Sequence, residues 1–426
     1  MAIGTKLQQL WWATRNWTMV RMLMQLQSPA GRADPYRVFA KLRAKGPVIH
    51  VPKVNWIVPR YAEAAAVLRD PRFSSDFDKR VERPGWDLEA RRAWREQHIS
   101  ARMMRDFMLF KDDPDHGRLR KLVSGAFTPR VVEAMRGRIE TIANELLDAV
   151  EPAGGMDLIP DFAYPVPMTV ICELLGVPAE DRPSFRRWTS TFARVLDPVA
   201  NPEEEAKLTA AGDEAMEGFV AYLTDLVANR RRQPGEDLLS ALIAARDGGD
   251  RLTENELMST CVLLLVAGHE TTANLIGNGT LALLRHPEEL RKLWEEPALI
   301  VSAVEELLRY DSPVAGAQRI TREDVELAGK TIPAGHDVII GISSANRDPD
   351  RFADPDRLDI TREDNKHLAF SGGPHFCLGA TLARLEGQVA LHTLVQRFPK
   401  LRLGAEEPEW RDTITLRGLR TLPVSF

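Results

Sequence analysis

Cysteine is scarce in this sequence, which has only 3 in 426 residues, and no two of them form a Cys-x-x-Cys pair. This scarcity excludes a disulfide-stabilised secreted domain, because such domains contain several cysteine pairs. It also argues against a structural zinc site, which needs cysteines and histidines at short spacings. We therefore predict a reducing environment and a cytoplasmic location.

Residues 1–30 lack acidic side chains and also lack a long apolar run. Lys6, Arg15 and Arg21 interrupt the apolar residues before the roughly 20 that a membrane-spanning helix requires. There is also no compact apolar core followed by a small-residue cleavage site, which a signal peptide would have. We predict an amphipathic helix that packs on the protein body, with a helix lying on a membrane surface as the alternative. Its apolar residues fall near helical spacing: Leu7, Leu10, Trp11, Trp17, Val20 and Met24.

A strong positive charge is missing as well, since the formal net charge is −5. That balance argues against general nucleic-acid binding. Internal repeats, low-complexity tracts and Pro/Ser-rich linkers are also missing. We therefore predict that residues 31–426 form one domain and residues 1–30 an N-terminal extension.

Apolar periodicity predicts a mainly α fold with a small β-rich lobe. Residues 77–107 are dense in charge without a clear period, and we interpret them as a long, mobile surface connection. Predicted helices cover residues 131–150, 165–175, 181–195, 203–229, 238–246 and 253–285, with shorter ones near 35–42 and 62–68. Predicted strands cover 48–51, 56–58, 338–342 and part of 414–426, with a hairpin turn in 327–335.

The stretch from Phe370 to Ala380 concentrates the chemistry of the chain. Cys377 follows a loop rich in glycine and proline and comes directly before a helical pattern. A helix N-terminus lowers a thiol's pKa, because unpaired N–H groups and the dipole favour the thiolate. A shielded thiolate suits a soft, electron-donating ligand of iron. The glycines that allow a flat ligand to approach and the phenylalanines that cover it are Phe370, Gly372, Gly373, Phe376 and Gly379.

Two other interpretations of Cys377 remain open from the residues alone. A buried structural cysteine packs as a small hydrophobe, and it needs no ligand. A cysteine nucleophile paired with His375 would also favour a helix N-terminus.

The spacing of Phe370, Gly373, His375, Cys377 and Gly379 resembles the heme-binding loop of the cytochrome P450 superfamily, soluble bacterial type. Ser371 stands where many members have glycine, a small-for-small change that leaves the turn plausible. The resemblance covers residues 34–426 and implies the triangular prism fold of that superfamily. It also implies heme b (iron protoporphyrin IX) as the cofactor, with Cys377 as the axial ligand of the iron.

A second motif lies inside the helix predicted for 253–285, which opens with the capping box Thr253-x-x-Glu256. Glycine and two threonines in its middle are poor helix formers, and Thr271 is placed to hydrogen-bond the Ala267 carbonyl one turn earlier. The sequence Ala267-Gly268-x-Glu270-Thr271 resembles the oxygen-binding helix motif of the superfamily. The resemblance implies that Glu270 and Thr271 deliver protons during oxygen activation, whereas a solvent-facing glutamate and a back-bonded threonine are the structural alternative.

Cations for the two heme propionates are also implied by the resemblance. His116 and Arg120 lie one turn apart on a predicted helix, and Arg319 supplies a third group. Carboxylates on a buried cofactor need such partners, because an unpaired buried charge is costly. Lining residues of the substrate pocket are implied at Val266, Val314, Ala315 and Thr415.

Glu306 and Arg309 form an i,i+3 pair on another predicted helix. The resemblance implies that they join a second arginine, for which we identify Arg357, in a network that holds the cofactor-side core together. We assign these three residues to structure and not to catalysis.

The function implied is that of a heme-thiolate monooxygenase, which inserts one oxygen atom of O2 into an organic substrate by hydroxylation or epoxidation. A bulky apolar natural product is the substrate class expected for the family, and electrons would come from NAD(P)H through a reductase and a separate ferredoxin or flavodoxin. Three rivals are a peroxide-driven peroxygenase of the same fold, a catalytically silent homologue that activates a partner, and a colourless cysteine hydrolase. The Glu270–Thr271 pair argues against the first, and Cys377 argues against the second.

Overall fold

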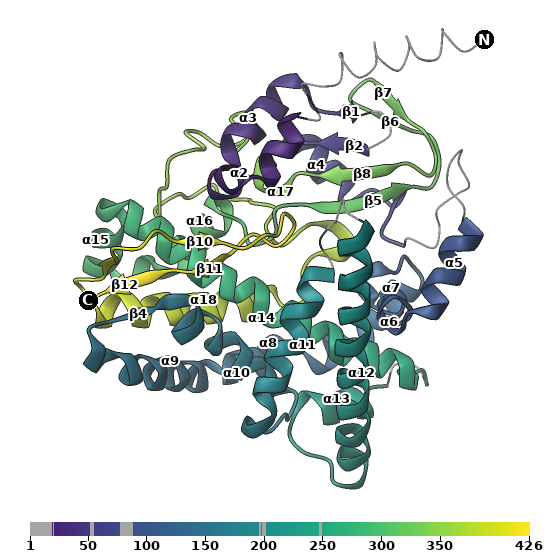
Figure 1. The fold of residues 1–426 in the computed structure, drawn as a ribbon, viewed down its shortest axis with the longest axis horizontal. Helices are drawn as coiled ribbons and strands as arrows, with labels where there is room; N and C mark the ends of the chain where they lie inside the picture. Colours follow the sequence, from purple (N-terminus) through teal and green to yellow (C-terminus); the bar gives the residue numbers. More distant parts are fainter. Residues whose placement is uncertain are drawn as a thin grey trace.

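The computed structural model of the chain describes residues 19, 21–51, 55–76, 88–195, 197, 202–246 and 249–426. Helices fill one side of the molecule, and a smaller β region lies along the other (Figure 1). The mainly α fold with a small β-rich lobe that the sequence predicts is confirmed.

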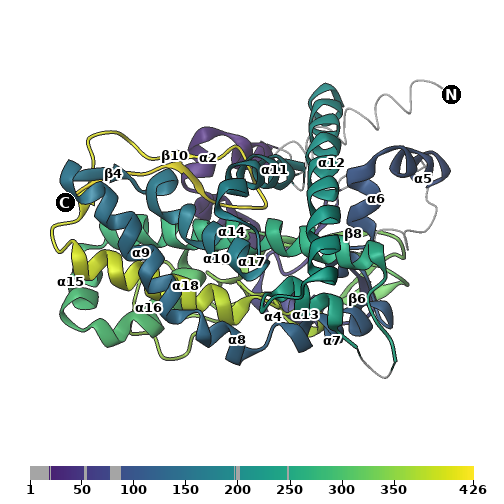
Figure 2. The same ribbon diagram turned by 90° about the horizontal axis from the view of Figure 1, so that it is seen from below.

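The central element is α14 (Glu254–Arg285), and nearly all its residues from Leu257 to Leu283 are buried. The helix begins where predicted, because the side chain of Thr253 accepts from the Glu256 N–H and Glu256 accepts in return from the Thr253 N–H. That capping box satisfies two backbone donors that would otherwise lack partners. Figure 2 shows α14 within the helical layer, and α18 (Ala380–Arg397) packs against it. The Cys377 loop leads directly into α18.

Most of the other helices lie within one or two residues of their predicted bounds. The prediction for 131–150 is divided, because a break at Met135 separates α8 from α9. The remaining helices are α2 (Pro29–Ala33), α3 (Tyr36–Lys45), α4 (Tyr61–Val67), α5 (Leu88–Gln97), α6 (Ile99–Arg105), α7 (Asp115–Ala126), α8 (Pro129–Ala134), α9 (Arg136–Val150), α10 (Pro165–Leu174), α11 (Arg182–Val195), α12 (Pro202–Arg232), α13 (Leu238–Ala244), α15 (Pro287–Glu295), α16 (Ile300–Tyr310) and α17 (Ile342–Ala345).

The largest sheet has the strand order β1-β2-β8-β5-β3. Its β2 and β8 strands are parallel, with Ile57 opposite Ile339, and the other neighbouring pairs are antiparallel. A hairpin of β6 and β7 precedes β8, as the turn-rich sequence predicts. The strands of this region are β1 (Ile49–Val51), β2 (Asn55–Val58), β3 (Phe73–Ser74), β5 (Ala317–Thr321), β6 (Val325–Leu327), β7 (Lys330–Ile332) and β8 (Asp337–Ile340).

Near the C-terminus, a second sheet has the order β4-β12-β9, and a third pairs β10 with β11. The β10–β11 pair contains a register shift between Glu409 and Trp410. These strands are β4 (Gly155–Asp157), β9 (Arg402–Leu403), β10 (Glu409–Trp410), β11 (Leu419–Thr421) and β12 (Pro423–Ser425).

The prediction of a long mobile connection over 77–107 is wrong for the part that the structure describes. Residues from Leu88 to Arg105 form α5 and α6. Ser100 is buried where α6 begins, because its N–H (2.9 Å) and hydroxyl (2.6 Å) donate to Asp213 of α12. This partner lies more than a hundred residues away in the sequence, so local periodicity could not indicate it. Residues 77–87 lie outside the described ranges.

The predicted N-terminal helix falls mostly outside the described part of the chain. Met19 and residues 21–27 are helical, and Met22 is buried against Phe39 and Ile57. How residues 1–18 are placed, and the division into an extension and one domain, stay predictions. Within the described ranges, no helix is both long and apolar enough to cross a bilayer.

Candidate functional site

The Cys377 loop bends sharply between Phe370 and α18. The Cys377 N–H donates to the Phe370 carbonyl (2.9 Å), and Phe370 itself is buried. Gly373 adopts φ +66°, and a Cβ there would lie only 2.5 Å from the Leu68 carbonyl oxygen. This glycine is therefore required by both its conformation and the close approach of the chain before β3. Cys377 is exposed, whereas Cys172 and Cys261 are buried.

Two details of the sequence-based prediction for Cys377 need correction. First, α18 begins at Ala380 and not directly after the cysteine. Second, although Cys377 keeps an accessible face, the protein atoms packed around its thiol desolvate it and raise its pKa above the ordinary value, while the Gly379 N–H and the charges of Arg120 and Arg384 act in the opposite direction. The helix end therefore does not hold a thiolate by itself. A metal bound to the sulfur would do so, because it would replace the proton.

Ser371 has a left-handed backbone, with φ +64°. The sequence-based view that serine merely replaces glycine in this turn misses this strain. A non-glycine residue pays on the order of 1 kcal/mol in this conformation, because its Cβ crowds the following carbonyl. The loop therefore carries backbone strain at Ser371, six residues before Cys377.

The variant Ser371→Gly is therefore expected to raise the free energy of unfolding by about 1 kcal/mol. Thermal unfolding measured alongside Ser371→Ala provides the check, because alanine removes the hydroxyl yet keeps the Cβ. A gain for alanine equal to that for glycine would show that the backbone strain is not the cause.

The predicted propionate-binding residues converge beside the loop. The rings of His116 and His375 lie 4.1 Å apart between centroids, and His116 is buried. Burial, together with the positive charges of Arg319, His116 and Arg120, lowers the pKa of His375 to about 3. Burial likewise lowers the pKa of Arg319 to about 10. The structure thus brings His116, Arg120, Arg319 and His375 into one electrostatic cluster.

This cluster fits a flat ligand that carries carboxylates. Within the described ranges, neither the half-buried Arg120 nor the buried Arg319 has a carboxylate oxygen within 4.0 Å, although a buried cation such as Arg319 normally does. The nearby Asp112 is engaged elsewhere, since it accepts from Ser74 (2.5 Å) and from the Ser75 N–H (3.0 Å). Beside Cys377, a Cβ on Gly379 would meet nothing within 4 Å. Heme matches these features. Its iron suits the Cys377 thiol, its flat ring suits the space beside Gly379, and its two propionates suit the excess of cationic groups.

Glu270 and Thr271 occupy the middle of α14. Thr271 Oγ1 donates to the Ala267 carbonyl (3.0 Å), which confirms the predicted back-bond, and the helix stays continuous through this turn. Ala267 is exposed and Gly268 half-buried, although the helix around them is buried. Glu270 is fully buried. The alternative that this glutamate simply faces solvent is therefore wrong.

The Glu270 carboxylate has one anchored and one free oxygen. Oε2 accepts from Arg411, whereas Oε1 has no hydrogen-bond partner and lies 3.7 Å from His269 Nε2. Burial raises the pKa of Glu270, but His269 and Arg411 outweigh it and bring that pKa below its ordinary value. The carboxylate is therefore ionised at neutral pH despite its burial.

Three of the four predicted pocket residues meet at one place. Val314 forms a β-bridge with Leu416, and the Ala315 N–H donates to the Thr415 carbonyl (2.8 Å). Val266 is buried and belongs to the main helical core. Their role in substrate binding stays a prediction.

The arginine network around Glu306 corrects the sequence-based assignment. Arg309 forms a bidentate pair with Glu306, with both distances 2.8 Å, and both side chains are fully buried. The second arginine is Arg362 and not Arg357, because Arg362 Nε lies 3.1 Å from Glu306 Oε2. The side chain of Arg357 is 61% exposed and pairs with Asp359, and only its carbonyl accepts from Arg309. Both arginines lie in irregular chain, so spacing alone could not distinguish them.

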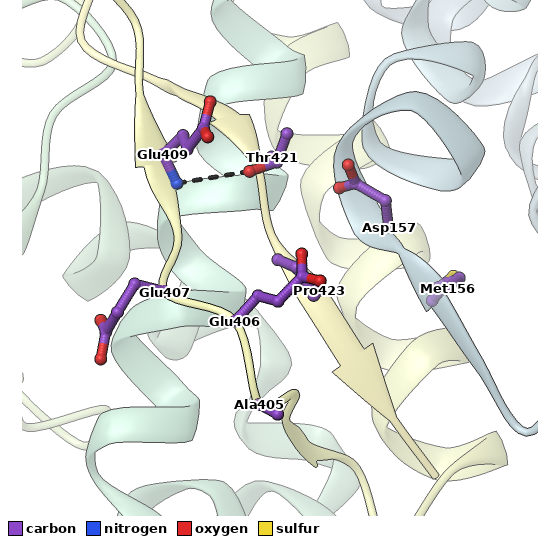
Figure 3. A pocket seen from close by; sticks show the side chains of 8 residues that line it. All are labelled: Met156, Asp157, Ala405, Glu406, Glu407, Glu409, Thr421 and Pro423. Carbon is purple, nitrogen blue, oxygen red and sulfur yellow. Dashed lines mark hydrogen bonds between the residues drawn. The ribbon is translucent and has the colours of Figure 1, made fainter.

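An open pocket at the C-terminal sheets lies apart from these groups (Figure 3). None of the predicted site residues lines it. Its lining is Met156, Asp157, Ala405, Glu406, Glu407, Glu409, Thr421 and Pro423.

Sequence reasoning missed two neighbours of the predicted site residues. Arg411 reaches Glu270 from the segment after β10, and Arg384 on α18 lies 4.5 Å from the Phe370 ring centroid while it binds Glu305 (2.6 Å). Neither residue belongs to a recognisable local pattern. Only the folding of distant segments places them.

Comparison with known proteins agrees with this geometry. The family model described as "Cytochrome P450" matches residues 86–413. "Cytochrome P450 107B1" of Saccharopolyspora erythraea is 45% identical over 401 residues, which cover 92% of this chain and 95% of that protein. "6-deoxyerythronolide B hydroxylase" of the same organism is 44% identical, covering 94% of this chain and 98% of the relative.

Among solved structures, that of "P450BioI in complex with hexadec-9Z-enoic acid ligated Acyl Carrier Protein" is similar with a TM-score of 0.85 and 40% identity. The match covers 93% of this chain and 99% of the other. Members of this family bind heme b, so heme b is the cofactor of this chain, and its attachment at Cys377 stays a prediction. With a family model that matches more than half of its length and relatives of this similarity, the chain belongs to the cytochrome P450 family of oxidoreductases.

Proposed function

We propose that this P450 inserts one oxygen atom of O2 into a bulky apolar organic substrate of the natural-product type, by hydroxylation or epoxidation. Electrons would come from NAD(P)H through a reductase and a separate ferredoxin or flavodoxin. The names of relatives support this substrate class, since one similar protein is a 6-deoxyerythronolide B hydroxylase and another is a "Polyketide biosynthesis cytochrome P450 PksS". A cytoplasmic location, without membrane contact through residues 1–18, stays a prediction.

In this proposal each group of the cofactor has a partner in the chain. Cys377 Sγ would bind the iron, and His116, Arg120, Arg319 and His375 would bind the propionates. The bound heme supplies the iron chemistry by which O2 is reduced. The protein's part is to exclude water, to neutralise the carboxylates and to donate electron density from sulfur.

The protons that oxygen reduction consumes would pass through Glu270 and Thr271. The free Oε1 of Glu270 can take up and release a proton, because no hydrogen bond occupies it. The Thr271 hydroxyl lies next in sequence, and rotation about χ1 would exchange its bond to Ala267 for one to an incoming group. This buried acid beside an alcohol is the single observation that best supports O2-dependent chemistry over a peroxide-driven reaction.

Two measurements test the proposal. The reduced, carbon monoxide-treated protein is expected to give a thiolate-type heme spectrum, which a cysteine hydrolase or a silent homologue without heme would not give. Product formation is then expected to need O2 and an electron donor. Efficient turnover with peroxide alone, and none with O2 and donor, would instead favour the peroxygenase. Compounds that shift the heme spin state would identify the substrate class.

The variant Thr271→Ala is expected to retain the heme spectrum but to release roughly ten times more reducing equivalents as peroxide, because proton delivery is lost while electron delivery is not. Peroxide and product are measured per NAD(P)H consumed. Thr280→Ala is the matched control, since its hydroxyl also bonds back within α14 (2.7 Å to the Ile276 carbonyl) but lies more than two turns away. Equal coupling in the two variants would remove Thr271 from the proton route.

A further inference from the structure

The anchoring of Glu270 depends on one residue outside α14. Arg411 donates to Glu270 Oε2, and the Arg411 side chain is 23% exposed whereas the carboxylate is fully buried. The other ionisable groups near this carboxylate are His269, whose Nδ1 donates to the Leu265 carbonyl (2.6 Å), and Tyr164, whose ring packs on the His269 ring. Because the Leu265 carbonyl only accepts, the Nδ1 atom of His269 carries a proton. Arg411 is therefore the one permanently charged partner of Glu270 among the described residues.

Arg411 is itself held by backbone bonds. Its N–H donates to the Gly418 carbonyl (3.0 Å), and Nε donates to the Leu419 carbonyl (3.3 Å). These bonds fix the Arg411 guanidinium where the two ends of loop 411–418 meet. This loop joins β10 to β11. The position of the Glu270 anchor is thus set by the conformation of that loop.

The same loop is tied to the end of α11 by Asp197. This carboxylate accepts from the N–H groups of Ile414 (2.8 Å) and Thr415 (2.7 Å), and the Thr415 carbonyl accepts from Ala315. Arg194 adds a bond to the Asp412 carbonyl (2.9 Å). In Figure 2 the yellow chain that carries the label β10 runs past α2 and on toward α11. Loop 411–418 therefore touches α11 on one side and Glu270 on the other.

We propose that Arg411 and Asp197 are positioning residues for the Glu270 carboxylate. Arg411 fixes Oε2 and leaves Oε1 free to exchange a proton, and Asp197 fixes the loop that carries Arg411. A displacement of the end of α11 is thereby transmitted to the Glu270 carboxylate. The connection runs from Asp197 to Ile414 and then along residues 411–414 to Arg411. The inference rests on the proposed proton role of Glu270.

Hydrogen exchange tests the role of Asp197 without turnover. In the heme-bound protein, Asp197→Ala is expected to accelerate amide exchange in a peptide that covers 412–416 by roughly tenfold, because two N–H groups lose an ionised acceptor. Asp412→Ala is the matched control in the same loop, since its half-exposed carboxylate binds Arg32 and Arg420 and not these amides. Its exchange is expected to change by no more than about twofold. Equal exchange in the two variants would overturn the role of Asp197.

Infrared spectroscopy tests the role of Arg411. In Arg411→Gln the buried Glu270 loses its counter-charge, so a protonated carboxyl band is expected at neutral pH and should disappear in the double variant with Glu270→Gln. Arg411→Lys keeps the charge and should keep the carboxylate ionised, which also covers the case in which the glutamine variant does not fold. Asp197→Ala should show part of the same band. An Arg411→Gln protein without a Glu270-dependent band would overturn the inference.

Coupling measurements separate this inference from the proposed function. Arg411→Gln and Asp197→Ala are expected to lower product formed per NAD(P)H by several-fold, up to about tenfold, and Arg411→Gln should add nothing once Glu270 is glutamine. If Glu270→Gln leaves coupling unchanged, the proton role of Glu270 fails. If Glu270→Gln uncouples the enzyme while Arg411→Gln and Asp197→Ala behave like Asp412→Ala, only the positioning role fails.

Discussion

Replacement of Cys377 by alanine is expected to abolish the thiolate-type carbon monoxide spectrum and the monooxygenase activity with it. The reason is that the sulfur is the only group of the loop able to donate electron density to the iron, a soft interaction that neither His375 nor a water molecule reproduces. Heme is still expected to bind weakly, because the cationic groups that face its propionates remain. The measurement is the reduced spectrum with carbon monoxide, together with the heme content per chain.

The other two cysteines provide matched controls. Cys172 and Cys261 are fully buried, and burial raises the pKa of each thiol to about 12, so neither forms a thiolate at neutral pH. Each alanine variant is expected to cost about 1 kcal/mol through a small cavity and to retain the spectrum. A thiolate-type spectrum in Cys377→Ala would mean that another sulfur binds the iron, and the site described above would be wrong.

Loss of the Glu306 carboxylate is expected to produce the largest fall in stability. Glu306→Ala leaves Arg309 as a fully buried cation without its counter-charge, at a cost of about 3–5 kcal/mol. The same change removes the acceptor of the Asp359 N–H (2.9 Å) and of Arg362. Because these bonds hold the irregular chain that leads to the Cys377 loop, heme content should fall together with the unfolding midpoint in urea.

The two downstream arginines show whether the network is correctly assigned. Arg362→Ala is expected to cost about 1.5–3 kcal/mol, since it removes a charge-assisted bond to a buried carboxylate. Arg357→Ala is expected to stay within about 0.5 kcal/mol of the parent protein, because its side chain is exposed. A larger loss of stability in Arg357→Ala than in Arg362→Ala would instead support Arg357 as the second arginine, as the sequence suggested.

Much of the site was predictable because its motifs are local. The five loop positions around Cys377 and the turn from Ala267 to Thr271 have fixed spacings, and local backbone geometry decides where their side chains point. The capping box at Thr253 likewise identified the start of α14, because both partners lie within one helical turn. Helix α6 was missed because the residue that stabilises its start, Asp213, lies on a distant helix.

By itself, the sequence determined the chemical class of this protein. A cysteine loop, an acid–alcohol pair and a His–Arg turn each lie within a few residues, so covalent geometry alone keeps their members together. Only the tertiary structure decided which distant side chains complete these groups: Arg362 and not Arg357 for Glu306, and Arg411 with Asp197 for Glu270. The physical reason is that a buried charge must find a counter-charge wherever the packed chain offers one, and sequence distance places no limit on that choice.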